Sequence, residues 1–362
     1  MKILAATGSS GGHIFPAVAF LDALKEKDSG IRTLLVLPRK SINDDLQLAG
    51  HNLRYVSITS LSPRLDAKNL RGLVNLIRGF WESLIIVIKF KPDIVVGFGS
   101  IASLPPVFWA WFFRIRTVIH EQNVIPGEAN RFLAKFVDRF AVSFDRTRHL
   151  LGVSPEKIVF TGNPLRGGLI RADKEEALGR LGLEKGKFTL LIVGGSQGSK
   201  RINSEAIRLF PGLRDNAGLQ VIHICGGADR EMLIDFYAEA GIRAAVFPFL
   251  KEMRLAYSCA DLAICRAGAT TVAELILFKL VSVIIPYPFA GAHQSANARV
   301  LEENGCATVI QEKELAPGKL KVIVEGLIND RAKLESMRTA FSGMESRPAA
   351  RLLAQAVLEL NA

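Results

Sequence analysis

The sequence predicts an α/β protein made of two Rossmann-like domains, each a parallel β-sheet covered by helices on both faces. Its 362 residues are enough for two domains at roughly 150 residues per domain. Short apolar runs alternate with helical patterns along the chain, which is typical of parallel sheets. The pattern also starts twice, because Lys2–Ala6 and Thr189–Val193 each lead into a glycine-rich turn and then a helix.

The predicted strands form two series, with helical stretches between most of them. The first series is Lys2–Ala6, Thr33–Leu37, Asp93–Gly97, Thr117–His120, Arg139–Val142 and Ile158–Thr161. The second series is Thr189–Val193, Gln220–Cys225, Ala244–Phe247, Leu262–Cys265, Val281–Ile285 and Thr308–Ile310. Residues 1–163 are therefore assigned to a first domain and residues 164–348 to a second. The final helix, residues 349–362, is expected to pack back on the first domain.

Composition narrows the class of protein. With 49% hydrophobic and 22% charged residues, the chain is globular rather than disordered. Its four cysteines form no CxxC pair, so buried thiols are expected and a metal site is not. The N-terminal apolar run is too short for a signal peptide, and no transmembrane helix is expected.

The formal net charge of +11 is concentrated in the first half. Residues 1–165 hold 21 Lys and Arg against 13 Asp and Glu, a net charge of +8, whereas residues 166–362 hold 25 against 22. A basic half favours a phosphate ligand, anionic lipid or nucleic acid as partner, although a basic but otherwise ordinary surface explains it equally well. No basic-aromatic binding motif is present, so no nucleic-acid partner is expected.

The first candidate site is the glycine-rich turn that precedes His13. Glycines let the backbone approach a ligand closely, and a helix start presents free N–H groups to anions. The spacing is not GxGxxG, so dinucleotide binding is not implied. His13 stands at the carboxyl edge of the predicted sheet, where open α/β sheets bind ligands. A tight turn with a capping histidine is the alternative.

The second half of the chain contains two more glycine turns between a strand and a helix start. They lie at Gly194–Ser199 and at the start of Arg266–Glu274. The second of them favours a diphosphate at the positive end of the helix dipole. Thr270 or Thr271 can cap that helix. Glu274, placed in its first turn, either accepts hydrogen bonds from a ribose diol or complements the dipole.

Three polar segments complete the set. Pro286–Ala298 carries His293 and Gln294, whose donor and acceptor groups suit sugar hydroxyls. His120–Asn123 places four polar residues after a buried strand, which is costly unless they are satisfied. In Thr161–Arg166, the guanidinium of Arg166 can bind a phosphate with two hydrogen bonds. Parallel sheets place such turns on one edge, so both sets are expected to face one cleft.

Taken in order, these segments resemble the MurG family of GT-B glycosyltransferases, which make the peptidoglycan precursor lipid II. They read SSGGHIFPA, GFGSIAS, HEQN, TGNPLR, GGSQGS, RAGATTVAEL and HQSANA, and the resemblance covers essentially the whole chain. There are two departures. The first loop has Ser9-Ser10 where Gly-Thr is usual, and Gly291-Ala292 stands where many members carry an acidic residue.

The resemblance implies roles for individual positions. Ser10, Gly11, Gly12 and His13 match the first loop; Gly97, Gly99 and Ser100 match a loop that faces the acceptor pyrophosphate; Asn123, Arg166 and Ser196 match contacts to the UDP-sugar. Leu250 matches a residue whose backbone contacts uracil, and Gln294 matches a donor-sugar ligand, with the substrate-binding candidate His293 beside it. The segment that holds the diphosphate and ribose is matched by Ala269, Thr270, Thr271, Val272, Ala273 and Glu274.

The implied reaction is inverting transfer of GlcNAc from UDP-GlcNAc to the 4-hydroxyl of MurNAc in lipid I, the undecaprenyl-pyrophosphoryl-MurNAc-pentapeptide. A base must take the hydroxyl proton. His13 is the leading candidate because histidine titrates near neutrality, and Glu121 is the second. Fixed donors near Ala269–Thr271 and Arg166 would stabilise the departing diphosphate. No DxD motif is present, so neither a cofactor nor a bound metal is expected.

The polyprenyl acceptor implies a peripheral enzyme on the cytoplasmic face of the inner membrane. Residues 69–91 and 104–116 mix apolar side chains with Arg and Lys, which suits an anionic bilayer surface, although both could be core helices. Three other functions remain open: a diacylglycerol glycosyltransferase, a UDP-sugar epimerase of similar architecture, and a non-catalytic nucleotide-sugar-binding membrane protein.

Overall fold

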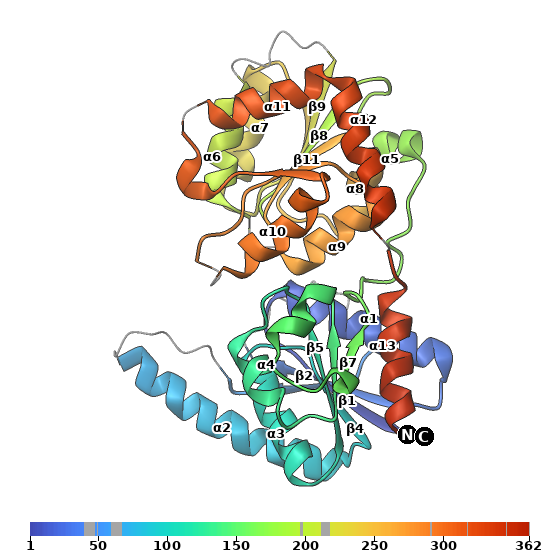
Figure 1. The fold of residues 1–362 in the computed structure, drawn as a ribbon. Coiled ribbons are helices and arrows are strands. Elements are labelled where there is room, and N and C mark those ends of the chain that lie inside the picture. The colour runs from blue at the N-terminus through green and yellow to red at the C-terminus, as the bar shows by residue number, and fades with distance from the viewer. Residues whose placement is uncertain are drawn as a thin grey trace. The chain divides into compact units, whose positions relative to one another are not determined.

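The computed structural model describes residues 1–39, 48, 50–58, 67–195, 198–210, 218–289, 292–316, 318–344 and 346–361. The chain forms two compact units, the first of Met1–Gly167 with Arg347–Ala362 and the second of Gly168–Ser346 (Figure 1). Residues 164–167 and 347–348, which the sequence assigned to the second domain, therefore belong to the first unit, and Arg166 with them.

Seven parallel strands form the sheet of the first unit, in the order β3-β2-β1-β4-β5-β6-β7. They are β1 (Lys2–Ala6), β2 (Arg32–Pro38), β3 (Leu53–Val56), β4 (Ile94–Gly97), β5 (Arg116–Glu121), β6 (Arg139–Val142) and β7 (Ile158–Phe160). Strand β3 was not predicted. It lies at the edge of the sheet and buries only Val56, so it has no apolar run to mark it.

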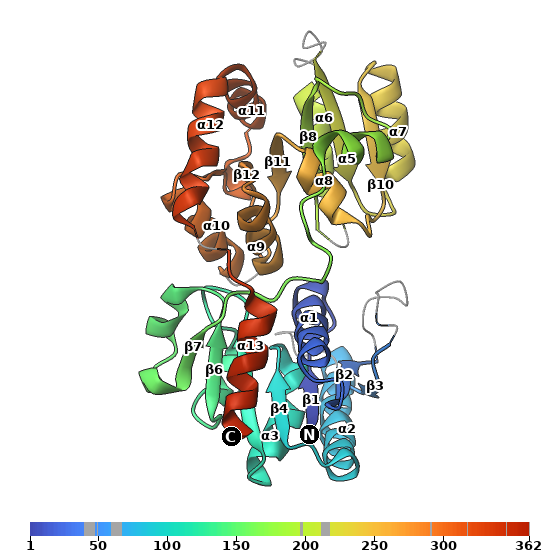
Figure 2. The same cartoon turned by 90° about the vertical axis from the view of Figure 1, so that its right-hand side faces the viewer.

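Helices cover both faces of this sheet because strand side chains alternate. Ile3 and Ala5 of β1 pack against α1 (Gly11–Lys27) and α13 (Ala349–Leu358), whose Leu353 is fully buried. Leu4 and Ala6 face the opposite core, with residues of α2 (Ala67–Phe90), α3 (Leu104–Phe112) and α4 (Glu128–Leu133). The C-terminal helix thus completes the core of the first unit (Figure 2).

The second unit contains a six-stranded parallel sheet in the order β10-β9-β8-β11-β12-β13. Its strands are β8 (Phe188–Val193), β9 (Leu219–Ile224), β10 (Arg243–Phe247), β11 (Leu262–Cys265), β12 (Ser282–Ile284) and β13 (Ala307–Val309). Its helices are α5 (Lys174–Arg180), α6 (Lys200–Leu209), α7 (Arg230–Glu239), α8 (Met253–Cys259), α9 (Ala269–Phe278), α10 (His293–Glu303), α11 (Lys319–Asn329) and α12 (Arg331–Ala340).

Both sheets reverse their strand order beside their first strand, between β1 and β4 and between β8 and β11. Open α/β sheets bind ligands at such switch points, beyond the carboxyl ends of the strands. The loops that follow these four strands are four of the segments singled out in the sequence. The connectivity of each sheet therefore brings two of them together at one place.

All four cysteines are free and buried in the second unit, as predicted. Burial raises the pKa of the Cys259 and Cys265 thiols to about 12 and that of Cys306 to about 11. These thiols are therefore protonated and poorly nucleophilic in the folded chain.

Candidate functional site

His13 lies between the two loops that flank the switch point of the first sheet. Helix α1 has Ser10 as N-cap and begins at Gly11, so His13 is a residue of its first turn and not its cap. A Cβ atom added to Gly8 would lie 2.9 Å from His13 Cδ2, and one added to Gly99 would lie 3.3 Å from Cε1. The imidazole therefore occupies a slot that the two glycines leave open.

The loop after β4 contains a strained residue. Gly97 ends the strand, Phe98 is fully buried and Gly99 has φ +80°. Ser100 follows with φ 66° and ψ 157°, a conformation that is almost restricted to glycine. Such strain concentrates at ligand clamps, and here it lies next to His13, because a Cβ on Gly8 would lie 2.6 Å from Ser100 Cβ.

Ser100→Gly is expected to stabilise the first unit by about 1 kcal/mol, since relief of strain worth about 1–3 kcal/mol outweighs the added freedom of the unfolded chain. Urea unfolding followed by tryptophan fluorescence measures this. Ser154→Gly is the matched control, because exposed Ser154 has an ordinary φ of −54° and should gain nothing. A destabilised Ser100→Gly protein would contradict the strain argument.

The segment His120–Asn123 forms a buried network rather than a simple exposed turn. Strand β5 continues through Glu121, and His120, Glu121 and Gln122 are each at most 1% exposed. Gln122 Oε1 lies 3.0 Å from His13 Nδ1, and Gln122 Nε2 lies 3.0 Å from His120 Nδ1. Burial lowers the pKa of His120 to about 4, so this imidazole is neutral at physiological pH.

Glu121 holds the loop that leads into α4. Its Oε1 accepts from the Asn123 backbone N–H at 2.9 Å and from Asn123 Nδ2 at 3.1 Å. Its Oε2 accepts from the Gly127 N–H at 3.0 Å and from Asn130 Nδ2 at 2.7 Å. A carboxylate with four donors is suited to fixing Asn123, and less suited to taking a proton from substrate.

Three buried polar side chains nearby have atoms without a hydrogen-bond partner in the part of the chain that the structure describes: Thr7 Oγ1, Asn130 Oδ1 and both amide atoms of Asn163. Buried polar groups are nearly always paired, so these are candidates for substrate contact. The sequence motif included Asn163 without giving it a role. Its position two residues after buried Thr161, beyond the end of β7, was the available signal.

Arg166 is held at the end of the same unit. Its guanidinium lies over the ring of Phe15 of α1, 4.1 Å from the centroid. Stacking on an aromatic face restricts the orientation of the guanidinium.

In the second unit, the loop after β8 depends on glycine at position 198. Gly198 has φ +76°, and a Cβ there would lie 2.1 Å from the carbonyl oxygen of Cys225. Ser199 then caps α6 by accepting from the Ile202 N–H. Ser196, expected to contact the donor, lies outside the described residues.

Arg266 fastens this loop to two other segments. Its side chain donates to Ser199 Oγ at 2.8 Å and to the Ile285 carbonyl at 3.1 Å, and it forms an ion pair with Glu312 at 2.5 Å. The sequence singled out the motif that begins here but gave Arg266 no role. The contacts make it the residue that positions the switch-point loops of the second sheet.

The structure of helix α9 differs from two expectations, the capping by Thr270 or Thr271 and the place of Glu274 in the first turn. Its N-cap is Gly268, so neither Thr270 nor Thr271 caps it, and Glu274 is its sixth residue, in the second turn. Glu274 is 5% exposed and accepts from the Tyr257 hydroxyl at 2.7 Å, so complementing the dipole is not its main role. The first turns of α9 are formed by Ala269, Thr270, Thr271, Val272 and Ala273.

Gln294 lies at the start of α10, directly after His293. Its Oε1 accepts from the backbone N–H groups of Ala267 at 3.1 Å and Tyr287 at 2.9 Å. The carbonyl end is thereby committed to the loops, so Gln294 can offer a ligand only its amide hydrogens. Leu250, half-buried, lies in the segment between β10 and α8.

Comparison with known proteins places the chain. Residues 3–142 match the glycosyltransferase family 28 N-terminal domain, and residues 189–353 match its C-terminal domain. The UDP-N-acetylglucosamine--N-acetylmuramyl-(pentapeptide) pyrophosphoryl-undecaprenol N-acetylglucosamine transferase of Halothermothrix orenii is 38% identical over 350 residues, 93% of each chain. The transferase of the same name from Listeria monocytogenes is 35% identical over 364 residues, 99% of each chain.

Solved structures agree with this assignment. Acinetobacter baumannii MurG has a TM-score of 0.76 at 26% identity, over 99% of both chains. A putative UDP-N-acetylglucosamine 2-epimerase from Listeria monocytogenes has a TM-score of 0.70 at 13% identity, which shows a shared fold alone. The predicted GT-B fold class and the resemblance drawn from the motifs are confirmed. The chain belongs to glycosyltransferase family 28 and, within it, to the MurG family.

Proposed function

We propose that this protein transfers GlcNAc from UDP-GlcNAc to the 4-hydroxyl of MurNAc in lipid I, forming lipid II for peptidoglycan synthesis. The observation that carries the proposal is identity of 35% over 364 residues, 99% of each chain, to a transferase named for this reaction. Four of the motifs that align the chain with this family follow the strands at the switch points, β1, β4, β8 and β11, where substrates of α/β proteins bind.

The acceptor hydroxyl would lose its proton to His13. The ring nitrogen Nε2 bonds to no described residue, whereas Nδ1 faces Gln122. General-base assistance of this kind contributes about 10²–10⁴-fold to a rate. Asn163, Ser100 and the N-terminal turn of α1 lie on the same unit and are proposed to hold the acceptor pyrophosphate.

The donor would bind to the second unit. The N-terminus of α9 offers backbone N–H groups to the diphosphate, and the buried Oγ1 of Thr270, which lacks a partner among the described residues, is able to add a donor. Glu274 would accept from the ribose hydroxyls and Gln294 would donate to the sugar. These fixed dipoles stabilise charge that develops as UDP leaves.

A transfer assay tests the function directly. Radiolabelled UDP-GlcNAc is incubated with a lipid I analogue or with diacylglycerol, and the linkage of the product is determined. A β-1,4-linked disaccharide from lipid I alone is the expected result. Transfer to diacylglycerol, epimerisation of the nucleotide sugar, or binding without turnover would each contradict the proposal.

An exposed apolar surface on the first unit supports peripheral attachment to an anionic membrane, on the cytoplasmic face where lipid I is made. None of the described helices combines the length and apolar character needed to cross a bilayer. Large apolar side chains are nevertheless exposed along α2, α3 and α4: Leu73, Val74, Ile77, Trp81, Ile85, Ile88, Trp111, Phe112 and Phe132. Much of α2 is therefore not core, although Val87 is, and Leu76, Ile86 and Phe90 pack against the same core.

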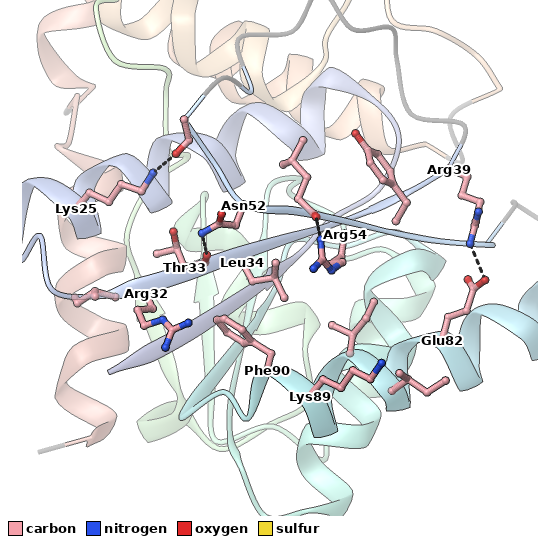
Figure 3. A pocket seen from close by; sticks show the side chains of 16 residues that line it. Lys25, Arg32, Thr33, Leu34, Arg39, Asn52, Arg54, Glu82, Lys89 and Phe90 are labelled. Atoms are coloured by element: carbon pink, nitrogen blue, oxygen red, sulfur yellow. Dashed lines mark hydrogen bonds and ion pairs between the residues drawn. The ribbon is translucent and has the colours of Figure 1, made fainter.

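A basic pocket lies beside this apolar surface. Its volume is about 790 Å³, and it is lined by residues of β2, β3 and α2 that include exposed Ile85. Figure 3 shows Arg32, Arg54 and Lys89 around Phe90, and none of the three forms an ion pair with a described carboxylate. Cations next to apolar side chains suit the phosphate and acyl region of an anionic lipid.

Ile77→Gln is expected to weaken binding to phosphatidylglycerol vesicles by about tenfold, since losing one buried Ile contact amounts to roughly 1.5 kcal/mol. Vesicle flotation measures the change. Val322→Gln is the matched control, because Val322 is 69% exposed but lies on α11 of the second unit. Equal binding of both variants, or of the wild type to phosphatidylcholine and phosphatidylglycerol, would contradict the membrane surface.

A further inference from the structure

A chain of hydrogen bonds connects His13 to the backbone at the end of β7. His13 Nδ1 lies 3.0 Å from Gln122 Oε1, Gln122 Nε2 lies 3.0 Å from His120 Nδ1, and His120 Nε2 lies 3.0 Å from the carbonyl oxygen of Gly162. His120 and Gln122 are buried, whereas His13 is only partly buried. The Gly162 carbonyl oxygen at one end of this chain determines which group donates in each bond.

The Gly162 carbonyl oxygen can only accept, so His120 Nε2 must carry a hydrogen. His120 is fully buried and neutral, so its Nδ1 has no hydrogen and must accept. The group that donates to it is the Gln122 amide nitrogen.

The orientation of the Gln122 amide is fixed a second time. Its Nε2 also lies 3.0 Å from the His120 carbonyl oxygen, so both amide hydrogens face acceptors. A flipped amide would turn Oε1 toward two acceptors and leave all three groups unsatisfied. Gln122 therefore presents Oε1 to His13, and His13 Nδ1 must donate to it.

We propose that His120 and Gln122 are positioning residues that hold neutral His13 as its Nδ1–H tautomer and leave the lone pair of Nε2 available to the acceptor hydroxyl. This rests on the proposed function, in which His13 is the base. When the hydroxyl attacks, its proton moves to Nε2, and the imidazolium keeps donating from Nδ1 to Gln122 Oε1. No proton travels further, because Gln122 is a neutral amide whose hydrogens are already used.

The chain of hydrogen bonds from Gly162 through His120 and Gln122 holds the His13 imidazole without a carboxylate. Of the described carboxylates nearby, Glu121 is directed to Asn123, Gly127 and Asn130, not to His13. The tautomer of His13 is thus set by the dipole of the Gln122 amide and not by a charge.

The first test is NMR of protein labelled with ¹⁵N-histidine, which distinguishes protonated from unprotonated ring nitrogens. At neutral pH, wild-type His13 is expected to show a protonated Nδ1 and a bare Nε2. In Gln122→Met, which removes the acceptor at similar size, His13 should shift toward the Nε2–H form that predominates in free histidine. Wild-type His13 found mainly as the Nε2–H form would overturn the proposal.

Kinetics supply the second test. Gln122→Met should lower kcat by about 10–10³-fold, the scale expected when a catalytic histidine loses its tautomer, with little change in either KM. Gln122→Glu keeps an acceptor for Nδ1 and adds a charge, so the acid limb of its kcat/KM profile should move to higher pH. Reduced activity in both variants with an unmoved acid limb would show a merely structural role.

Controls separate the loss of this hydrogen-bond chain from other causes of low activity. Gln355→Met makes the same change at an exposed position of α13 in the same unit and should leave kcat unchanged. Tryptophan fluorescence confirms that each variant is folded. If His13→Ala retains activity while wild-type His13 is the Nδ1–H tautomer, His13 is not the base, but its positioning by Gln122 and His120 is supported. If His13→Ala is inactive but wild-type His13 is the Nε2–H tautomer, His13 is supported as the base, but its positioning by Gln122 and His120 is wrong.

Discussion

His13→Ala is expected to lower kcat by about 10²–10⁴-fold, with KM for UDP-GlcNAc changed no more than a few-fold. The variant removes the proton acceptor from the switch point of the first sheet and leaves the donor contacts of the second unit intact. Its fold should be retained, because the substitution shortens a partly buried side chain in the slot between Gly8 and Gly99 and removes one hydrogen bond, that to Gln122. Initial rates with a lipid I analogue at varied UDP-GlcNAc separate kcat from KM.

His149→Ala is the matched control, since His149 is exposed and lies outside the proposed site, so its kcat should equal that of the wild type. Near-normal turnover by folded His13→Ala would remove His13 as the base. Such a result would return Glu121, the second candidate, to consideration despite its four hydrogen bonds.

Glu121→Gln is expected to destabilise the first unit by about 2–5 kcal/mol, the scale for disrupting a buried, charged hydrogen-bond centre. The side-chain amide would direct its own hydrogens toward the Gly127 N–H and Asn130 Nδ2, or toward the two donors of Asn123. Urea unfolding measures the loss selectively, because all three tryptophans, Trp81, Trp109 and Trp111, lie in the first unit.

Glu128→Gln serves as its control. Glu128 lies on the same loop-to-helix segment, but its side chain is 91% exposed, so the change should cost less than about 1 kcal/mol. If folded Glu121→Gln were as stable as the wild type but inactive, Glu121 would act in the chemistry and not in holding the loop.

Much of the fold could be predicted because buried parallel strands have a strong sequence signature. The bounds predicted for β1, β6 and β11 match the structure residue by residue. Strand β3 was missed because an edge strand with two exposed residues resembles a loop. Capping of α9 by Thr270 or Thr271 was wrong because Gly268, one residue earlier, has the extended backbone of an N-cap, with ψ 143°.

The site was predictable as a set of loops but not as a network. Glycine turns after strands mark the switch points, so His13 and the α9 segment could be singled out in advance. The bond between His13 and Gln122 joins residues 109 positions apart, and that between His120 and Gly162 joins residues 42 apart. No local pattern encodes such pairings, which depend on the register of neighbouring strands. Asn130, bonded to Glu121 from α4, was missed for the same reason.

All four cysteines lie in the second unit, so the rate at which a thiol reagent modifies the native chain reports on that unit alone. A thiol reagent can modify these side chains only when that unit opens, since burial keeps them inaccessible and protonated. UDP-GlcNAc bound to the folded second unit should slow modification in proportion to the fraction of protein that is occupied. A ligand that binds only the first unit should not slow it. Donor affinity can thus be read from labelling rates on the unaltered protein, without acceptor or turnover.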